Sequence, residues 1–433
     1  MTRTMKDSGV EWIGQIPEKW KVGKLKYFID IYGRIGFRGY TQNDLVGEGE
    51  GAITLSPSNF NDMKMNYSKC SYLSWPKYYE SPEIQIQNND ILFVKTGSTY
   101  GKSVLVKNLP MEATINPQLI VLKNVKINLN FCAYMFQTSI IKHQVEISVV
   151  GGTIPTISQS KIENYYLILP PLPEQQAIAD YLDDKCAQIN NITATINEQI
   201  EVLKQYKKSV ITEAVTKGLD PNAPMKDSGV EWIGRIPEHW EVIKGKYRLK
   251  LLNRPVKEND EVITCFRDGE VTLRSKRRED GFTISLQETG YQGINPGDLV
   301  VHGMDGFAGA IGISDSRGKA TPVLNVLDTK ENKKFFMYYL RTLAFTEVFI
   351  ALSTGIRVRS CDTNWNKLRQ LVYLIPPLSE QQAIADYLGD KCTKIDAVIA
   401  DKQAQLETLA AYKKSLIYEY VTGKKSVPGF EEA

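Results

Sequence analysis

The spacing of apolar residues divides the chain into two kinds of region. After Pro170-Pro171, and again after Pro376-Pro377, apolar residues recur at seven-residue intervals over a long stretch. The regions before these stretches carry short apolar runs separated by Gly, Asn and Pro. A seven-residue apolar repeat is typical of a helix that pairs with another helix, whereas short punctuated runs are typical of strands. The pattern therefore predicts two α+β bodies, each followed by one long helix.

Six short apolar runs are expected to form strands, three in each body. They are Ile91–Val94, Val104–Val106 and Leu119–Leu122 in the first body, and Val262–Phe266, Leu299–Val301 and Val323–Val326 in the second. Because the runs follow one another in the same order in both bodies, we predict that a single fold is used twice.

Each long helix is predicted to span roughly 40 residues, which is about 60 Å at 1.5 Å per residue. Glu174 and Glu380 fall in the first turns, where the helix dipole favours a negative charge. The predicted seam residues are Leu182, Ile189, Ile196, Leu203 and Val210 in the first helix, and Leu388, Ile395, Leu409 and Leu416 in the second. Ile192 and Tyr206, and likewise Val398, Leu406 and Tyr412, are expected to complete the apolar core, which Lys402 interrupts.

An isolated helix of this length with an exposed apolar stripe would be unstable. We therefore predict that the two helices pair as an antiparallel coiled coil. The alternative is that each helix packs separately on its own body.

The edges of these regions are duplicated in the sequence. Met5–Trp20 recurs with two substitutions as Met225–Trp240, at an offset of 220 residues. Ile168–Ile189 recurs as Leu374–Ile395, at an offset of 206 residues, so the second interior is 14 residues shorter. The two interiors have diverged while their edges have not. This is the pattern expected of two readers of different targets built on one scaffold.

Charge and composition narrow the classes of function. At 433 residues the chain suits two to four domains. The net charge is +4 over residues 21–167 and +5 over residues 241–373, whereas the remainder carries −6. Basic bodies suit contact with a polyanion, although ordinary surface charge is the alternative. Six cysteines without a CxxC pair, and only three histidines, argue against a zinc site and a disulfide framework. Reduced thiols in a cytoplasmic protein are therefore expected. No membrane span is expected either.

Two glycine-rich stretches resemble nucleotide-binding motifs only superficially. Val94–Ser103 has three residues between its glycines where a phosphate loop requires four, and a strand is expected where a helix must follow. Gly306–Gly312 has the wrong glycine spacing for a dinucleotide site and is predicted to be a turn leading into a strand. Asn116–Leu119 lacks the second proline and the aromatic ring of an amino-methyltransferase motif. The sequence therefore predicts neither catalytic residues nor metal ligands.

The repeated motifs carry a family resemblance. The two SGVEWIG-IPE-W entry segments, the two PPL-EQQAIADYL helix starts, and the order entry, body, helix resemble the specificity subunit of type I restriction–modification systems over the whole chain. This resemblance implies target-recognition domains with their entry segments over residues 1–167 and 221–373. It also implies a central conserved helix over residues 168–220, a C-terminal conserved helix with a tail over residues 374–433, and pseudo-twofold symmetry.

The resemblance also implies partners. Such a subunit is not catalytic, reads a bipartite asymmetric site in double-stranded DNA, and binds no cofactor of its own. Two modification subunits would bind S-adenosylmethionine for adenine N6 methylation, and up to two restriction subunits would use ATP and Mg for translocation and cleavage. A system with methylation only, a self-sufficient enzyme, and a coiled-coil adaptor whose bodies bind protein are the alternatives.

Polar and basic residues in the predicted loops are the candidates for DNA contact, because base edges and phosphates are bound by such side chains. They are Arg34, Arg38, Lys64, Lys95, Ser98, Tyr100 and Lys102 in the first body, and Arg267, Arg274, Lys276, Arg277, Arg278, His302, Arg357 and Arg359 in the second. For any single residue, a solvated surface charge is the alternative interpretation.

Overall fold

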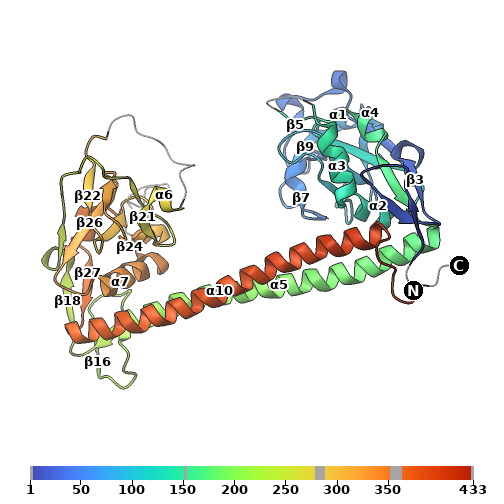
Figure 1. The fold of residues 1–433 in the computed structure, drawn as a ribbon. Helices are drawn as coiled ribbons and strands as arrows, with labels where there is room; N and C mark the ends of the chain where they lie inside the picture. The colour runs from blue at the N-terminus through green and yellow to red at the C-terminus, as the bar shows by residue number, and fades with distance from the viewer. Residues whose placement is uncertain (1–2, 151–153, 278–287, 352–362, 431–433) are drawn as a thin grey trace. The chain divides into compact units, whose positions relative to one another are not determined.

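The computed structural model describes residues 3–150, 154–277, 288–351 and 363–430 (Figure 1). Two long helices are present, α5 (Leu172–Lys217) and α10 (Leu378–Val421). The chain forms two compact units, and each long helix contributes to both of them. Unit 1 comprises residues 1–195 and 404–433, whereas unit 2 comprises residues 196–403.

Unit 1 contains two main sheets. The first has the order β12-β11-β14-β4 and the second has the order β10-β13-β6-β9-β5. The strands of the first sheet are β4 (Asp30–Gly33), β11 (Ile91–Val94), β12 (Ser103–Leu105) and β14 (Leu119–Lys123). Those of the second are β5 (Leu45–Val46), β6 (Gly51–Leu55), β9 (Ser71–Ser74), β10 (Gln85–Ile86) and β13 (Ala113–Ile115).

Smaller elements complete unit 1. Three two-stranded ladders are formed by β1 (Met5–Asp7) with β2 (Gln15–Pro17), β3 (Lys21–Lys24) with β15 (Tyr166–Leu169), and β7 (Phe60–Asn61) with β8 (Lys64–Met65). The short helices are α1 (Trp75–Tyr79), α2 (Leu129–Met135), α3 (Ser139–Ser148) and α4 (Gln159–Glu163).

Unit 2 repeats the first sheet of unit 1. Its four-stranded sheet has the order β24-β23-β26-β19, with β19 (Leu249–Leu251), β23 (Leu299–His302), β24 (Ile311–Ile313) and β26 (Leu324–Thr329). This order corresponds strand for strand to β12-β11-β14-β4. All six predicted strands are confirmed, with ends that differ by up to three residues. The α+β fold class is likewise confirmed, and one sheet topology is used twice.

The other elements of unit 2 are short. Its ladders pair β16 (Met225–Asp227) with β17 (Arg235–Pro237), β18 (Glu241–Lys244) with β27 (Val372–Ile375), β20 (Ile263–Cys265) with β21 (Val271–Leu273), and β22 (Gln292–Ile294) with β25 (Gly318–Ala320). Its short helices are α6 (Arg274–Arg277), α7 (Lys333–Phe345), α8 (Val348–Ala351) and α9 (Trp365–Leu368).

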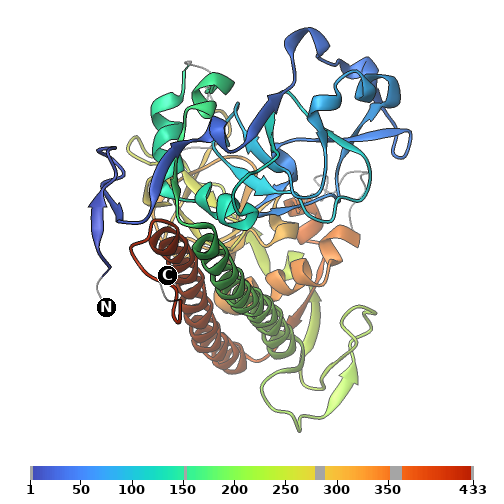
Figure 2. The same ribbon diagram turned by 90° about the vertical axis from the view of Figure 1, so that its right-hand side faces the viewer.

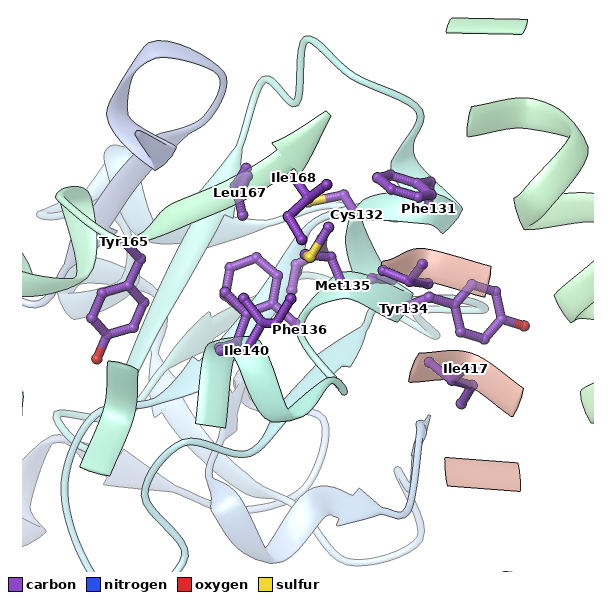
Figure 3. Packing of buried hydrophobic residues seen from close by; sticks show 14 of the residues in the cluster. Phe131, Cys132, Tyr134, Met135, Phe136, Ile140, Tyr165, Leu167, Ile168 and Ile417 are labelled. Carbon is purple, nitrogen blue, oxygen red and sulfur yellow. The ribbon is translucent and has the colours of Figure 1, made fainter. Parts of the chain in front are cut away.

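The core of unit 1 joins the body to both long helices. Phe131 and Met135 of α2 are fully buried among residues of the four-stranded sheet and of β15, and Ile417 of α10 belongs to the same cluster (Figure 3). Leu182 of α5 is also fully buried in this cluster. The long helices are thus part of the folded unit, and burying the apolar stripe provides the stability that an isolated helix would lack.

A tryptophan–glutamate contact ties each entry segment to the start of a long helix. In unit 1 the indole N–H of Trp20 donates to Glu174 at 2.8 Å, and Arg3 also contacts that carboxylate. In unit 2 the indole of Trp240 donates to Glu380 at 3.1 Å. The two duplicated motifs are therefore partners in space, which explains physically why both appear together twice in the sequence.

The first glutamine after each of these glutamates binds the start of a short helix in its own body. The side-chain oxygen of Gln175 accepts the N–H of Asn128, at the N-cap of α2, at 2.8 Å, and its amide group donates to the Pro170 carbonyl. Gln381 makes the same contacts to Asn332 and Pro376 in unit 2. An N-cap asparagine satisfies backbone N–H groups that have no partner within the helix.

In each unit the two long helices run side by side in antiparallel fashion (Figures 1 and 2). Tyr181 contacts Tyr420 and Asn190 contacts Lys413 in unit 1, whereas Lys207 contacts Asp396 in unit 2. The partner's number falls as the residue number rises, as antiparallel pairing requires. The predicted antiparallel coiled coil is confirmed.

The seam has one row that the sequence interpretation placed wrongly. The predicted seam residues are buried, except for Leu203 and Leu409, which are half-buried. Ile192, Tyr206, Val398 and Tyr412 were expected to complete the core, but they are exposed by 49%, 49%, 44% and 54%. Leu406, which was expected with them, is half-buried and does belong to the second row. The second row lies four residues after the first row instead of three. It consists of Cys186, Thr193, Ile200, Lys207 and Ala214 in α5, and of Cys392, Ile399, Leu406, Lys413 and Tyr420 in α10.

Glycines end both long helices against the entry segments. Gly218 has a φ of +77°, and a Cβ added there would lie 3.4 Å from the Trp240 ring. Gly423 has a φ of +72°, and a Cβ there would lie only 2.4 Å from Pro17. A left-handed glycine commonly ends a helix because this conformation costs other residues more. The last helix thus returns to the first entry segment of the chain.

Candidate nucleic-acid interface

Three loops of unit 1 meet at one end of its four-stranded sheet. We call this surface rim 1; it comprises residues 95–102, 116–118 and 154–157. The N–H of Lys95 donates to the Gln118 carbonyl at 2.9 Å, and the Lys95 carbonyl accepts the N–H of Ile157 at 2.9 Å. The N–H of Gly97 also donates to Pro155 at 3.1 Å. These backbone bonds hold the three loops together independently of their side chains.

The corresponding loops of unit 2 form rim 2, which comprises residues 302–310, 321–323 and 363. The N–H of Gly303 donates to the Val323 carbonyl at 2.7 Å, and the Gly303 carbonyl accepts the N–H of Thr363 at 2.7 Å. This is the same backbone scheme as in rim 1. Gly303 occupies the place of Lys95, and Val323 occupies the place of Gln118, so one backbone carries two different sets of side chains.

Rim 1 brings together four of the predicted contact residues, namely Lys95, Ser98, Tyr100 and Lys102. The three loops contain no Asp or Glu. Lys95 is half-buried, and this burial lowers the pKa of its ammonium group. A sheet edge that carries lysines and hydroxyl groups without carboxylates suits contact with phosphates and base edges.

The remaining candidates of the first body lie elsewhere. Arg34 is only 7% exposed, and its guanidinium donates to the Ile115 carbonyl and to Thr114 Oγ1. Burial lowers the pKa of Arg34. Its contacts support the sheet, so its polar atoms are not presented to a ligand. Arg38 lies 3.5 Å from Glu83.

Lys64 follows the turn between β7 and β8, away from rim 1. It lines a cavity of about 470 Å³ together with residues of β12, α2, α5 and α10, among them Ser103, Tyr134 and Lys413. Lys413 bonds Asp62 at 2.9 Å on the same wall. Lys64 therefore belongs to the lining of this cavity and not to the residues of rim 1.

Two candidates of the second body belong to rim 2 or border it. His302 ends β23, and its Nδ1 accepts the N–H groups of Met304 and Asp305. Burial lowers the pKa of His302. Arg267 reaches the same loop, because its guanidinium bonds Asp305 at 2.8 Å.

The predicted basic cluster of α6 is accompanied by counter-charges. Arg277 donates to both carboxylate oxygens of Asp268 and to Glu270, and it lies 4.0 Å over the Phe266 ring. Lys276 bonds Asp315 and Ser316, and Arg274 bonds Thr264. The cluster is thus largely compensated within unit 2. Arg278, Arg357 and Arg359 lie outside the described residues.

The sequence interpretation missed the amide side chains of the rims. Asn116 and Gln118 lie in the Asn-Pro-Gln turn between β13 and β14, which was considered only as an incomplete methyltransferase motif. Beside rim 2, Asn325 of strand β26 donates to the carbonyls of Val301 and Thr363. A usable signal was present, because a proline turn between two buried strands places its neighbours at a sheet edge.

The two glycine-rich stretches have the predicted local structure. Gly97 and Gly101 have φ values of +105° and +82° in a turn that leads into strand β12, and no helix follows. Residues 306–308 form a single helical turn before strand β24. Neither stretch therefore presents a helix N-terminus to phosphate.

Two kinds of feature are absent from the described ranges. No helix there is long and apolar enough to cross a membrane. No group of three or more His, Cys, Asp or Glu side chains in those ranges is arranged to hold a metal ion.

The comparisons with known proteins agree on one family. Residues 17–202 match the family model of the type I restriction modification DNA specificity domain. A Methanocaldococcus jannaschii protein provisionally named as the type I restriction enzyme MjaX specificity subunit is 26% identical over 432 residues, which cover 95% of each chain. The MjaVIII specificity subunit of the same organism is 28% identical over 79% of this chain and 80% of its own.

Residues 17–202 thus resemble a type I restriction modification DNA specificity domain, and 95% of the chain is similar to a type I restriction enzyme specificity subunit. Proteins of this family act in DNA sequence recognition. The fold agrees, because a solved structure reported for complex assembly and conformational transition of the type I R-M system superposes with a TM-score of 0.66. That alignment has 15% sequence identity and covers 95% of this chain and 99% of the other. The two rims are the candidate surfaces for contact with DNA.

Proposed function

We propose that each rim reads one half of a split, asymmetric DNA site. The observation that carries this proposal is the shared backbone scheme of rims 1 and 2 with unrelated side chains, Lys95 and Gln118 in one and Gly303 and Val323 in the other. Identical scaffolds position the loops in the same way, and different side chains contact different bases. The two half-sites should therefore differ in sequence.

We further propose that the chain is not itself an enzyme. Modification subunits bound to it would carry S-adenosylmethionine and methylate an adenine in each half-site, and restriction subunits would carry ATP and Mg. The paired helices α5 and α10 would set the unread spacer between the half-sites, for which about one helical turn of DNA is expected. The similarity to specificity subunits supports this division of labour, as does the report of complex assembly for the structurally similar system.

Single-molecule methylation mapping tests the proposal. Cells expressing the chain with its neighbouring modification subunit should gain one split, asymmetric motif with N6-methyladenine in each half. Replacing residues 241–373 by the matching body of a relative should change one half only. If the assembled complex adds no methylated motif, the bodies are not DNA readers, and the protein-binding adaptor becomes the better interpretation.

A further inference from the structure

The side chain of Gln118 is an exposed amide group of rim 1 that the neighbouring Asn116 side chain holds. Its own N–H donates to Asn116 Oδ1 at 3.0 Å, and its carbonyl accepts the N–H of Lys95. Its side-chain oxygen accepts a bond from Asn116 Nδ2 at 3.0 Å. Gln118 is nevertheless exposed. Both its backbone and its amide plane are therefore held before any ligand arrives, which lowers the entropic cost of binding.

Gly97 leaves the space that this amide needs. The φ of Gly97 is +105°, and a Cβ added there would lie 3.1 Å from Gln118 Nε2. A side chain at position 97 would therefore both strain the backbone and displace the amide nitrogen. The glycine in the β11–β12 turn thus leaves room for the side-chain amide of Gln118 in the Asn-Pro-Gln turn.

The held amide has unused hydrogen-bonding capacity. Its oxygen retains a second lone pair, and no acceptor for its NH₂ group is observed among the described residues. One acceptor and one donor side by side match the N6 amino group and the N7 atom of adenine in the major groove. Guanine presents two acceptors at this edge, and a cytosine or thymine in the same place offers no such pair.

Rim 2 has no equivalent group. The residues in the places of Asn116 and Gln118 are Thr321 and Val323. The amide of the neighbouring Asn325 donates to two backbone carbonyls instead. Among the described residues of the two rims, a bidentate amide contact at this place is thus available in rim 1 only.

We propose that Gln118 reads an adenine in the half-site of unit 1 and that Asn116 holds the Gln118 side chain in place. This assignment rests on the proposed function of rim 1, because it takes that surface to be a DNA-reading surface. It makes Gln118 a specificity-determining residue that composition and charge did not reveal.

The test uses the complex of the full chain with its modification subunits. Methylation motifs are mapped for the wild type, for Gln118→Val, which copies the residue of rim 2, and for Gln118→Glu. Gln118→Val should relax one position of one half-site, with about 5- to 150-fold less discrimination for adenine. Gln118→Glu should shift the preference at that position towards cytosine, because a carboxylate accepts from the cytosine amino group.

The controls separate this assignment from the proposed function. Asn116→Ala should weaken discrimination at the same position and at no other. The unfolding midpoints of both variants show whether they are folded. If the wild type gives a split motif and the folded variants Gln118→Val and Gln118→Glu leave it unchanged, the assignment of Gln118 is wrong while the proposed function of rim 1 stands. A wild-type complex that assembles but yields no motif overturns the assignment together with the function of rim 1.

Discussion

The indole nitrogen of Trp20 donates a 2.8 Å hydrogen bond to Glu174, a residue 154 positions further along the chain. The pair is buried, and the guanidinium of Arg3 lies against the same carboxylate. In unit 2 position 223 is alanine, so no arginine is available there, and His239 takes this place by bonding Glu380 at 2.8 Å. The tryptophan–glutamate hydrogen bond is thus buried in unit 1 and partly accessible to solvent in unit 2.

Removing each glutamate should therefore have unequal effects. Glu174→Ala removes the acceptor of the buried Trp20 indole N–H and a charged contact of the half-buried Arg3, which should cost about 3 kcal/mol of stability. Glu380→Ala should cost only about 1 kcal/mol, because the Glu380 side chain is 26% exposed and water can replace it. Scanning calorimetry of the purified chain measures both, and Glu174→Gln, which keeps an acceptor for Trp20, should fall between them. Equal losses for the two alanine variants would contradict this account.

The placement of the second seam row can be tested within unit 2. Leu388 is fully buried in α10, whereas Val398 is 44% exposed. Leu388→Ala should lower the free energy of unfolding by about 2–5 kcal/mol, since it leaves a cavity in the core. Val398→Ala should change it by about 0.5 kcal/mol or less. Urea denaturation of the isolated chain gives both values, and a large loss for Val398→Ala would restore the three-residue spacing.

Substitutions of Arg34 and Lys102 should have different effects, because Arg34 supports the fold and Lys102 is expected to contact DNA. Arg34→Met removes buried donors from Ile115 and Thr114 and should cost about 1–3 kcal/mol of stability. It should leave the salt dependence of DNA binding unchanged. Lys102→Ala should do the reverse and reduce the slope of log K against log salt by about 1, if Lys102 contacts a phosphate. Fluorescence anisotropy over a salt series distinguishes them, and an unchanged slope for Lys102→Ala would remove that residue from the interface.

Unit 2 should lose stability in acid through Asp260. The guanidinium of Arg317 bonds both carboxylate oxygens of Asp260 at 2.9 and 2.7 Å and holds the pKa of that carboxyl below its ordinary value. Because the folded-state pKa is depressed, the stabilisation is complete above the unfolded pKa of about 3.9 and is lost as pH falls below it. The Asp260→Asn variant should therefore have a lower unfolding temperature than the wild type at pH 6. Below about pH 4 the difference between the two unfolding temperatures should become smaller.

The matched control for Asp260 is Asp328→Asn. Lys333 likewise lowers the pKa of Asp328, but the Asp328 side chain is 46% exposed. Solvent screening should make its effect on the unfolding midpoint smaller. An equal acid response of the two variants would show that burial of the Asp260 pair is not the cause.

Strands and helices were predictable because their signal lies in nearby residues. The run Ile91–Val94 is apolar throughout and forms a fully buried strand. The second seam row was not predictable by the same reasoning, because Cys186 and Lys207 occupy it and neither looks like a core residue in a sequence. The exposed aromatic Tyr206 carried the stronger apolar signal, although Lys207 makes the contact across the helices.

The rims show a similar limit. Loop residues such as Lys95 and Lys102 were identifiable by type, and a turn brought them together. Arg34 has the same charge, yet long-range sheet contacts bury it, and no local pattern reveals such burial. Gln118 was missed for the opposite reason, since its importance comes from Asn116 and Gly97 beside it and not from its residue type.

The position of Gly423 against Pro17 has a consequence for biosynthesis. Unit 2 is one uninterrupted stretch, residues 196–403, so all of it has been made before the last 30 residues are added. Unit 1 begins first, yet residues 404–433 complete it, and its entry segment has no helix end to pack against until then. Domains commonly fold as they emerge from the ribosome. In this chain the domain that is started first is finished last, and its apolar core stays incomplete until the end of α10 has been made.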